Sequence, residues 1–220
     1  MTIVKGSGKR AEKARLTRRK IIAAAERLFI EHGYGATTVQ DVADAAGVAV
    51  QTIYFSFGNK RTLMKELVDV VIAGDDEPVP TLERRWFHDA TDAPSAAELL
   101  ERYTAGTAEI LARLAPVLKV AESAAATDPE LAELWRSDED PRYTVSAEAA
   151  RALVSKPDAA EGVGADHAAD VLYGLTSPEL YLVMVKSRGW SDEQWRGWAL
   201  ASLRAQLCKA PAGSPSETTR

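Results

Sequence analysis

Hydrophobic residues recur at helical spacing along most of the chain, and no stretch alternates apolar and polar residues as a half-buried strand would. Between Thr17 and His32 apolar residues repeat every third or fourth position before Gly33, a favoured residue just after a helix. The same spacing predicts helices over about 81–90, 95–126, 129–136, 142–155, 166–187 and 191–209. We therefore predict an all-α protein.

Shorter helices are predicted between the first helix and residue 73. Thr38 can cap a short helix, with Asp41 in the position of a capping-box partner. Gly47 then allows a sharp turn into a second short helix over 50–55, and Asn59 can cap a fourth helix. Two short helices joined by a glycine-containing turn and packed on a longer helix are typical of a helix-turn-helix. Plain packing units also have this form, so the spacing alone leaves both interpretations open.

Further signals mark helix ends and interruptions in the rest of the chain. Pro116 is expected to kink or split its long helix, and Asp128 followed by proline is a helix start. Ser177 can restart a helix before a proline, and Ser191 with Gln194 forms a capping box.

Charge is divided unevenly along the chain. Up to Met64 there are 11 Lys and Arg against 5 Asp and Glu, whereas the remainder carries 16 against 27. A basic segment on an otherwise acidic chain favours a polyanionic partner at that end. A solvated basic tail is the alternative explanation.

Other features limit the class of protein. No run approaches the roughly 20 apolar residues of a membrane-spanning helix, and no apolar segment of a secretion signal follows the basic start, so we expect a soluble cytoplasmic protein with no membrane partner. Cys208 is the single cysteine, and neither His88 nor His167 has metal-ligand spacing around it. We therefore assign no metal and no cofactor.

The stretch from Ile21 to Leu63 resembles the DNA-binding domain of the tetracycline-repressor (TetR) family of bacterial regulators. The run GVAVQTIYFSFGNK is its most diagnostic part, and LYGLTSPELYLVMVKSRGW has a looser resemblance to C-terminal regions of some members. The matching residues are Ile21, Ala25, Leu28, Phe29, Gly33, Tyr34, Thr37, Thr38, Val42, Ala43, Ala46, Gly47, Val48, Thr52, Ile53, Tyr54, Phe57, Lys60 and Leu63. The resemblance implies an all-helical homodimer that binds a double-stranded DNA operator, with a small-molecule pocket in its C-terminal domain. It also implies transcriptional repression that is relieved when the effector fills the pocket.

Domain boundaries follow from this resemblance and the helix pattern. We expect a flexible basic arm over 1–15, a helix-turn-helix domain over 16–58, a connecting helix and linker over 59–80, a helical ligand-binding and dimerisation domain over 81–209, and a disordered tail over 210–220.

The resemblance also indicates which residues contact DNA. Tyr54 and Lys60 resemble phosphate-contacting residues of the family, and a nearby phosphate would account for a lysine at a helix N-terminus, where the dipole disfavours cations. Gln51 and Thr52 are the best base readers, since a glutamine amide can pair bidentately with adenine. The full predicted set is Thr38, Ala49, Val50, Gln51, Thr52, Tyr54, Phe55, Lys60 and Arg18.

Three positions depart from the family pattern. Ala49 lacks the side-chain acceptor of the Ser or Thr that often caps the recognition helix, Gln51 stands where a small residue is common, and Ser56 where His is frequent. These differences do not affect the fold, but they prevent transfer of a known operator sequence. For Thr38, capping without a phosphate contact stays an alternative.

The C-terminal two thirds yield two sets of candidate residues. Residues expected to line a ligand pocket are Trp86, Phe87, Tyr103, Thr107, Trp135, Tyr143 and Tyr173, although core packing is the commoner role of such aromatics. Residues expected at a four-helix dimer interface are Leu172, Leu175, Leu180, Val183, Trp195, Trp198 and Leu203.

Two other functional classes, an enzyme and an architectural DNA-binding protein, fit the sequence less well than a regulator. An enzyme is disfavoured because GxSxG, P-loop and complete Rossmann motifs are missing, and Gly162 with Gly164 supplies only the start of the last. A sequence-neutral architectural DNA-binding protein would suit the basic arm, but the large acidic helical region argues against it.

Overall fold

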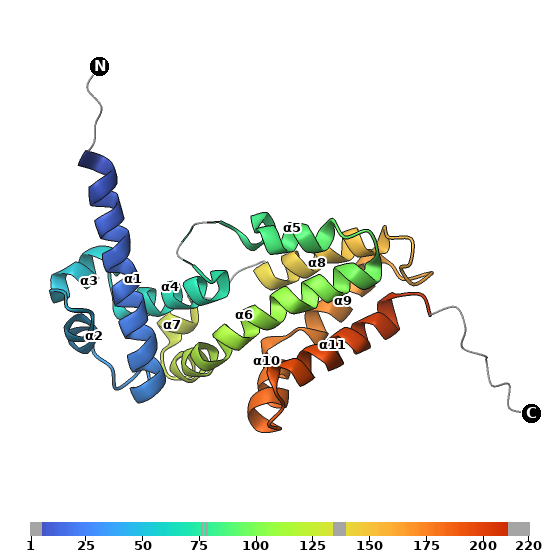
Figure 1. Cartoon of the computed structure of the whole chain (residues 1–220). Coiled ribbons are helices and arrows are strands. Elements are labelled where there is room, and N and C mark those ends of the chain that lie inside the picture. The colour runs from blue at the N-terminus through green and yellow to red at the C-terminus, as the bar shows by residue number, and fades with distance from the viewer. Residues whose placement is uncertain (1–5, 76, 78, 134–139, 211–220) are drawn as a thin grey trace, which may run out of the picture. The chain divides into compact units, whose positions relative to one another are not determined.

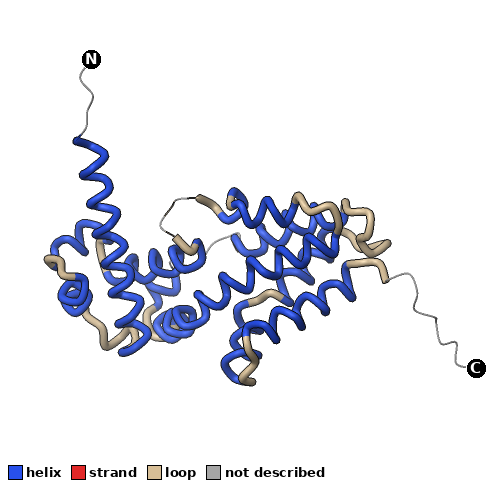
Figure 2. Tube along the Cα trace, in the orientation of Figure 1, coloured by secondary structure: helices blue, strands red, loops and turns tan. Residues whose placement is uncertain are grey.

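The structure is a computed structural model that describes residues 6–75, 77, 79–133 and 140–210. Every regular element within those ranges is a helix (Figure 2), apart from one isolated antiparallel bridge between Ala159 and Cys208. This confirms the predicted all-α fold. The chain divides into two compact units, each formed from two segments.

Unit 1 comprises Met1–Glu77 and Arg113–Arg136. Its helices (Figure 1) are α1 (Gly6–His32), α2 (Val39–Ala46), α3 (Val50–Phe57), α4 (Lys60–Ala73), the second part of α6 (Ala96–Ala125) and α7 (Pro129–Glu133). One hydrophobic core joins them, with buried members that include Ile21, Phe29, Ile53, Leu67, Leu114, Val117, Ala121 and Leu131. The unit that holds the short helices therefore also needs a segment from the middle of the chain, which the predicted boundaries place in the C-terminal domain.

Capping side chains set the starts of the short helices as predicted. The Thr38 hydroxyl accepts the Asp41 N–H, and the Asp41 carboxylate accepts the Thr38 N–H, so the capping box of α2 is complete. Gly47 ends α2 in the left-handed region at φ 67°, where a side chain would be strained. Asn59 accepts the Thr62 N–H at the start of α4, whereas Ala49 makes no side-chain cap for α3.

The first helix is longer than predicted. We expect a flexible arm over residues 1–15, but α1 begins at Gly6. Residues 9–15 are exposed, so they show no apolar periodicity, although their Ala, Lys, Arg and Glu residues favour a helix. The arm prediction is therefore wrong from Gly6 onward, and residues 1–5 lie outside the described residues.

Unit 2 comprises Pro78–Ala112 and Ser137–Arg220. It contains a 3-10 turn (Thr81–Glu83), α5 (Arg85–Thr91), the first part of α6, α8 (Pro141–Val154), α9 (Ala165–Leu175), α10 (Pro178–Tyr181), a π-helical turn (Leu182–Ser187) and α11 (Asp192–Leu207). Ser177 restarts the helix and Ser191 forms the capping box with Gln194, both as predicted. Pro116 lies inside α6 without splitting it. The predicted tail, apart from residue 210, lies outside the described residues.

Burial changes the predicted dimer surface. Leu172, Trp195 and Leu203 are fully buried in the chain itself, so their assignment to an interface with a second copy is wrong. Helical periodicity marks them as apolar but does not distinguish a core facing the same chain from one shared with a partner. Val183 is 50% exposed and remains available for such a contact.

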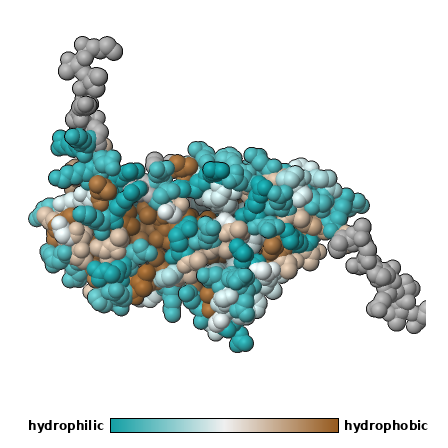
Figure 3. Space-filling view, viewed as in Figure 1, coloured by the Kyte–Doolittle hydropathy of each residue, from teal (hydrophilic) through white to brown (hydrophobic). Residues whose placement is uncertain are grey.

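The described surface exposes few large hydrophobic side chains. The face in view in Figure 3 is mainly hydrophilic, and its brown residues gather over the part of unit 1 where Figure 1 labels α4 and α7. Exposed large hydrophobic residues are Leu16, Ile30, Tyr54, Phe55, Tyr143 and Val183, so two neighbours on α3 stand out. Within the described ranges, no helix combines the length and apolarity needed to cross a bilayer.

Candidate nucleic-acid interface

α3 has one face in the core and one in solvent. Ile53 and Phe57 are buried against α1, α2 and α4 in the core of unit 1, whereas Gln51, Tyr54 and Phe55 are exposed. Phe55 is 93% exposed, so its ring contributes nothing to the core of its own chain. A short helix that presents an amide, a phenol and a bare aromatic ring to solvent is suited to contact another molecule.

The turn from α2 into α3 leaves the first amides of α3 without a side-chain cap. The N–H of Val48 donates to Ala43 O at 3.0 Å within the turn, and Ala49 stands at the N-cap with extended backbone. Uncapped N–H groups at a helix start, together with the helix dipole, attract anions such as phosphate. This arrangement is consistent with the predicted role of α3 at a DNA surface.

Thr38 is occupied by its local structure. Its hydroxyl donates to Asp41 Oδ2 at 2.7 Å and accepts from the Asp41 N–H at 3.1 Å. The hydrogen bond from Thr38 also holds the pKa of Asp41 below its ordinary value. Its capping role is confirmed, and a phosphate contact through it stays a prediction.

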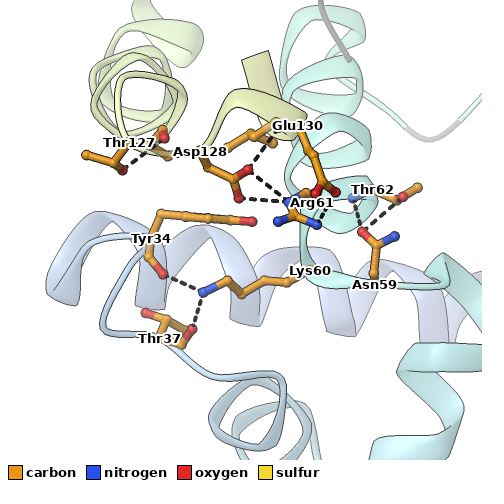
Figure 4. Close-up of polar contacts among 11 residues, drawn as sticks. Tyr34, Thr37, Asn59, Lys60, Arg61, Thr62, Thr127, Asp128 and Glu130 are labelled. Carbon is orange, nitrogen blue, oxygen red and sulfur yellow. Dashed lines mark hydrogen bonds and ion pairs between the residues drawn. The ribbon is translucent and has the colours of Figure 1, made fainter. Parts of the chain in front are cut away.

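Lys60 has partners within the protein that sequence did not indicate. Its Nζ donates to Tyr34 O and to Thr37 O, each at 2.9 Å, and lies 4.1 Å from the centroid of the Tyr34 ring (Figure 4). Partial burial lowers the pKa of this ammonium. The two carbonyl oxygens account for a lysine at the start of α4 without any phosphate. Since an ammonium has three N–H donors, one is left for a ligand.

Arg61, the next residue, joins α4 to α7. Its Nε donates to Asp128 Oδ1 at 3.0 Å and Oδ2 at 2.8 Å, and its Nη1 donates to Glu130 Oε2 at 2.7 Å (Figure 4). Asp128 also accepts the Leu131 N–H at the start of α7, as its predicted capping role requires. The hydrogen bond from Arg61 lowers the pKa of Asp128. Sequence alone gives no sign of a pair so far apart in the chain.

These groups surround an open depression of about 400 Å³. The depression is lined by Tyr34, Val39, Tyr54, Asn59, Lys60, Arg61 and Asp128. The structure thus brings the predicted phosphate ligands Tyr54 and Lys60 to one concave surface.

Arg18 packs inside unit 1. Its guanidinium lies 4.6 Å from the centroid of the Phe57 ring, forms an ion pair with Glu66 and donates to Ser56 O at 3.4 Å. These contacts hold α1 to α3 and α4. They give Arg18 a structural role that its predicted DNA contact did not include.

The predicted ligand residues in unit 2 form two groups. The Trp86 ring contacts those of Phe87 and Tyr103, with centroids 5.7 and 6.2 Å apart. Burial raises the pKa of Tyr103, whose hydroxyl lies 3.3 Å from Ser146 Oγ and also interacts with Thr107.

The second group is more exposed. Tyr143 and Tyr173 meet edge to face with centroids 5.6 Å apart, and Arg142 lies over the Tyr173 ring. Tyr173 donates to Asp140 at 2.5 Å. The remaining candidate, Trp135, lies outside the described residues.

Residues 21–67 match the family model described as bacterial regulatory proteins, tetR family. Over these residues, the chain is similar to the TetR family. Among curated proteins, the chain is 47% identical over 58 residues to the HTH-type transcriptional regulator TtgR of Pseudomonas putida. The match covers 26% of this chain and 28% of TtgR. It is 43% identical over 51 residues to a probable acrEF/envCD operon repressor of Escherichia coli, 23% of either chain. The chain thus matches only about a quarter of the length of these relatives.

Solved structures extend the likeness to the whole fold. The SmeT–triclosan complex has a TM-score of 0.68 at 20% identity, with 93% of this chain and 98% of SmeT covered. FadR of Bacillus subtilis in complex with stearoyl-CoA has a TM-score of 0.62 at 20% identity, with 84% of this chain and 96% of FadR covered. At 20% identity, the similarity to these solved structures concerns the fold alone.

Proposed function

We propose that the protein is a DNA-binding transcriptional regulator that represses its target genes and leaves its operator when a small-molecule effector binds. The observation that carries this proposal is the exposed face of α3, with Gln51, Tyr54 and Phe55, inside the segment that matches the tetR-family model. Gln51 and Thr52 read base edges, while Tyr54, Lys60 and the first amides of α3 contact phosphates.

Selection of binding sites from random DNA duplexes tests this function. A regulator enriches a two-fold symmetric site with half-sites about one helical turn apart, because each copy of a dimer places one recognition helix in the major groove. Enrichment of no sequence, with equal binding to all duplexes, would instead indicate an architectural protein.

We propose that the effector is a mostly apolar molecule that binds in unit 2 beside Trp86, Phe87 and Tyr103. The contact of these three rings and the buried hydroxyls near Tyr103 support this position. Related folds bind triclosan in SmeT and stearoyl-CoA in FadR. An effector that binds 5- to 150-fold more tightly to the free protein than to its operator complex, roughly 1–3 kcal/mol of coupling, weakens operator binding by the same factor. Titration of candidates into both forms measures that ratio.

We propose a homodimer that uses the surface around Leu175, Leu180, Val183 and Trp198, which is the part of the predicted set that is not fully buried. Val183→Glu should dissociate this dimer and leave each monomer folded, since Val183 is 50% exposed. Sedimentation of the wild-type chain as a monomer at micromolar concentration would contradict the dimer.

A further inference from the structure

The depression beside α3 contains a basic residue to which the proposed DNA contacts give no role. α4 begins with Lys60 and Arg61 and has no acidic residue in its first turn. Two adjacent cations at a helix N-terminus are disfavoured by the dipole and by each other. Carbonyl oxygens stabilise Lys60, whereas Arg61 depends on other partners.

Arg61 is neutralised by two carboxylates from α7 and the residue before it. Asp128 accepts both of its bonds from Nε, and Glu130 accepts from Nη1. The side chains of Arg61 and Asp128 are 39% and 20% exposed, so the pair lies at the surface and not in the core. Glu130 is 76% exposed and holds Arg61 from the solvent side.

The guanidinium has donors beyond these three bonds. Arginine carries five N–H groups in a planar fork, and the contacts with Asp128 and Glu130 engage only Nε and Nη1. The same side chain lines the depression together with Tyr54 and Lys60. A phosphate bound at Tyr54 would therefore lie in the same depression as the Arg61 guanidinium. Arginine can bind phosphate through two parallel hydrogen bonds, as it binds a carboxylate.

We propose that Arg61 is a ligand for a DNA phosphate that Asp128 and Glu130 hold back, so that protein carboxylates and the DNA backbone compete for one guanidinium. This inference rests on the proposed DNA-binding function. While the carboxylates hold Arg61, they reduce the attraction of α4 for any polyanion. Release of Arg61 adds a sequence-independent contact, because phosphates carry no base information.

Asp128→Asn tests the competition with little change in shape. Asparagine keeps the side-chain oxygen that caps α7 but removes the charge that holds Arg61. Binding to a random-sequence duplex is measured by fluorescence anisotropy between 50 and 200 mM KCl. One added phosphate contact steepens the slope of log K against log salt by about 0.9, so the variant binds more tightly at low salt and its advantage shrinks about 3.5-fold over that range.

Three further variants separate this effect from others. Arg61→Gln/Asp128→Asn should return the slope to the wild-type value, because the released ligand is gone. Asp69→Asn makes the same change of charge on α4 beside Lys65, away from the depression, and should leave the slope unchanged. Glu130→Gln should move the slope in the same direction as Asp128→Asn and serves if the latter does not fold.

The outcomes distinguish the two proposals. A wild-type protein that binds no duplex at any salt concentration refutes the proposed function. A wild-type protein that binds DNA, with an Asp128→Asn variant of equal or weaker affinity and unchanged slope, refutes the competition and makes Arg61 a purely structural link between α4 and α7.

Discussion

The Trp86 ring lies directly on Gly106, and its Cε3 atom is 2.3 Å from the place that a β-carbon of residue 106 would occupy. Two further ring atoms lie 2.9 Å from that place. α6 therefore approaches Trp86 as closely as it does only because this position has no side chain. The same Trp86 ring also contacts the rings of Phe87 and Tyr103.

Gly106→Ala should destabilise unit 2 by about 1–3 kcal/mol, because the methyl group displaces the Trp86 ring from its packed position. Urea unfolding measures the loss. Gly174→Ala in α9 is the matched control: nothing lies within 4 Å of its β-carbon, and the substitution should stabilise the helix by up to about 1 kcal/mol. Additive effects of Gly106→Ala and Trp86→Leu in a double-mutant cycle would show that the two positions do not interact.

Lys60→Met should lower both stability and the salt dependence of DNA binding. The apolar stem is kept, but Tyr34 O and Thr37 O lose their donor, which costs about 1–3 kcal/mol for hydrogen bonds to a charged group. If the third N–H also contacts a phosphate, the magnitude of the salt slope falls by roughly 1. Reduced stability with an unchanged slope would leave Lys60 as a support for the turn between α1 and α2 only.

Gln51→Ala and Tyr54→Phe should affect DNA binding in different ways. The first removes the proposed base reader and should relax discrimination at one base pair by about 1–3 kcal/mol, whereas the second should weaken binding to all sequences alike. Both side chains are exposed, so neither change should alter the free energy of unfolding by more than about 0.5 kcal/mol. If Gln51→Ala instead weakened binding to all sequences equally, Gln51 would be a contact to the DNA backbone and not to a base.

Acid should weaken unit 1 through Asp41 and Asp128. The hydrogen bonds from Thr38 and Arg61 hold both pKa values below the ordinary 3.8. Because the folded pKa lies below the unfolded one, the stabilisation is complete above pH 3.8 and is lost as the pH falls through the folded values. Urea midpoints measured from pH 7 downward should fall less steeply below pH 4 for Asp128→Asn than for the wild type, and equal steepness would contradict the assignment.

Structural features that depend on residues close together in the sequence were predictable from it. Features that depend on contacts between residues far apart in the sequence were not. The caps at Thr38, Asn59 and Ser191 follow from local rules and were correctly predicted. The exposed start of α1 was missed because a helix without a buried face has no periodic signal.

The candidate site shows the same division. Exposure of Gln51 and Tyr54 follows from the helical spacing of α3, which places Ile53 and Phe57 together on the buried face. The contact of Arg61 with Asp128 depends on how α4 packs against the α6–α7 turn, and no local pattern encodes it. The bonds of Lys60 to Tyr34 O and Thr37 O were not predicted for the same reason, since these carbonyl groups belong to the turn between α1 and α2.

The division of α6 between two compact units has a practical consequence for protein engineering. An N-terminal fragment that ends after α4 would lack Leu114, Val117, Ala121 and Leu131, which complete the core around Ile21 and Leu67. Transfer of unit 1, the proposed DNA-binding unit, to a different partner domain therefore requires residues 113–136 as well as residues up to 77. A chimera made by a single crossover would expose this core, so exchange of unit 2 has to replace two separate segments, 78–112 and 137–220.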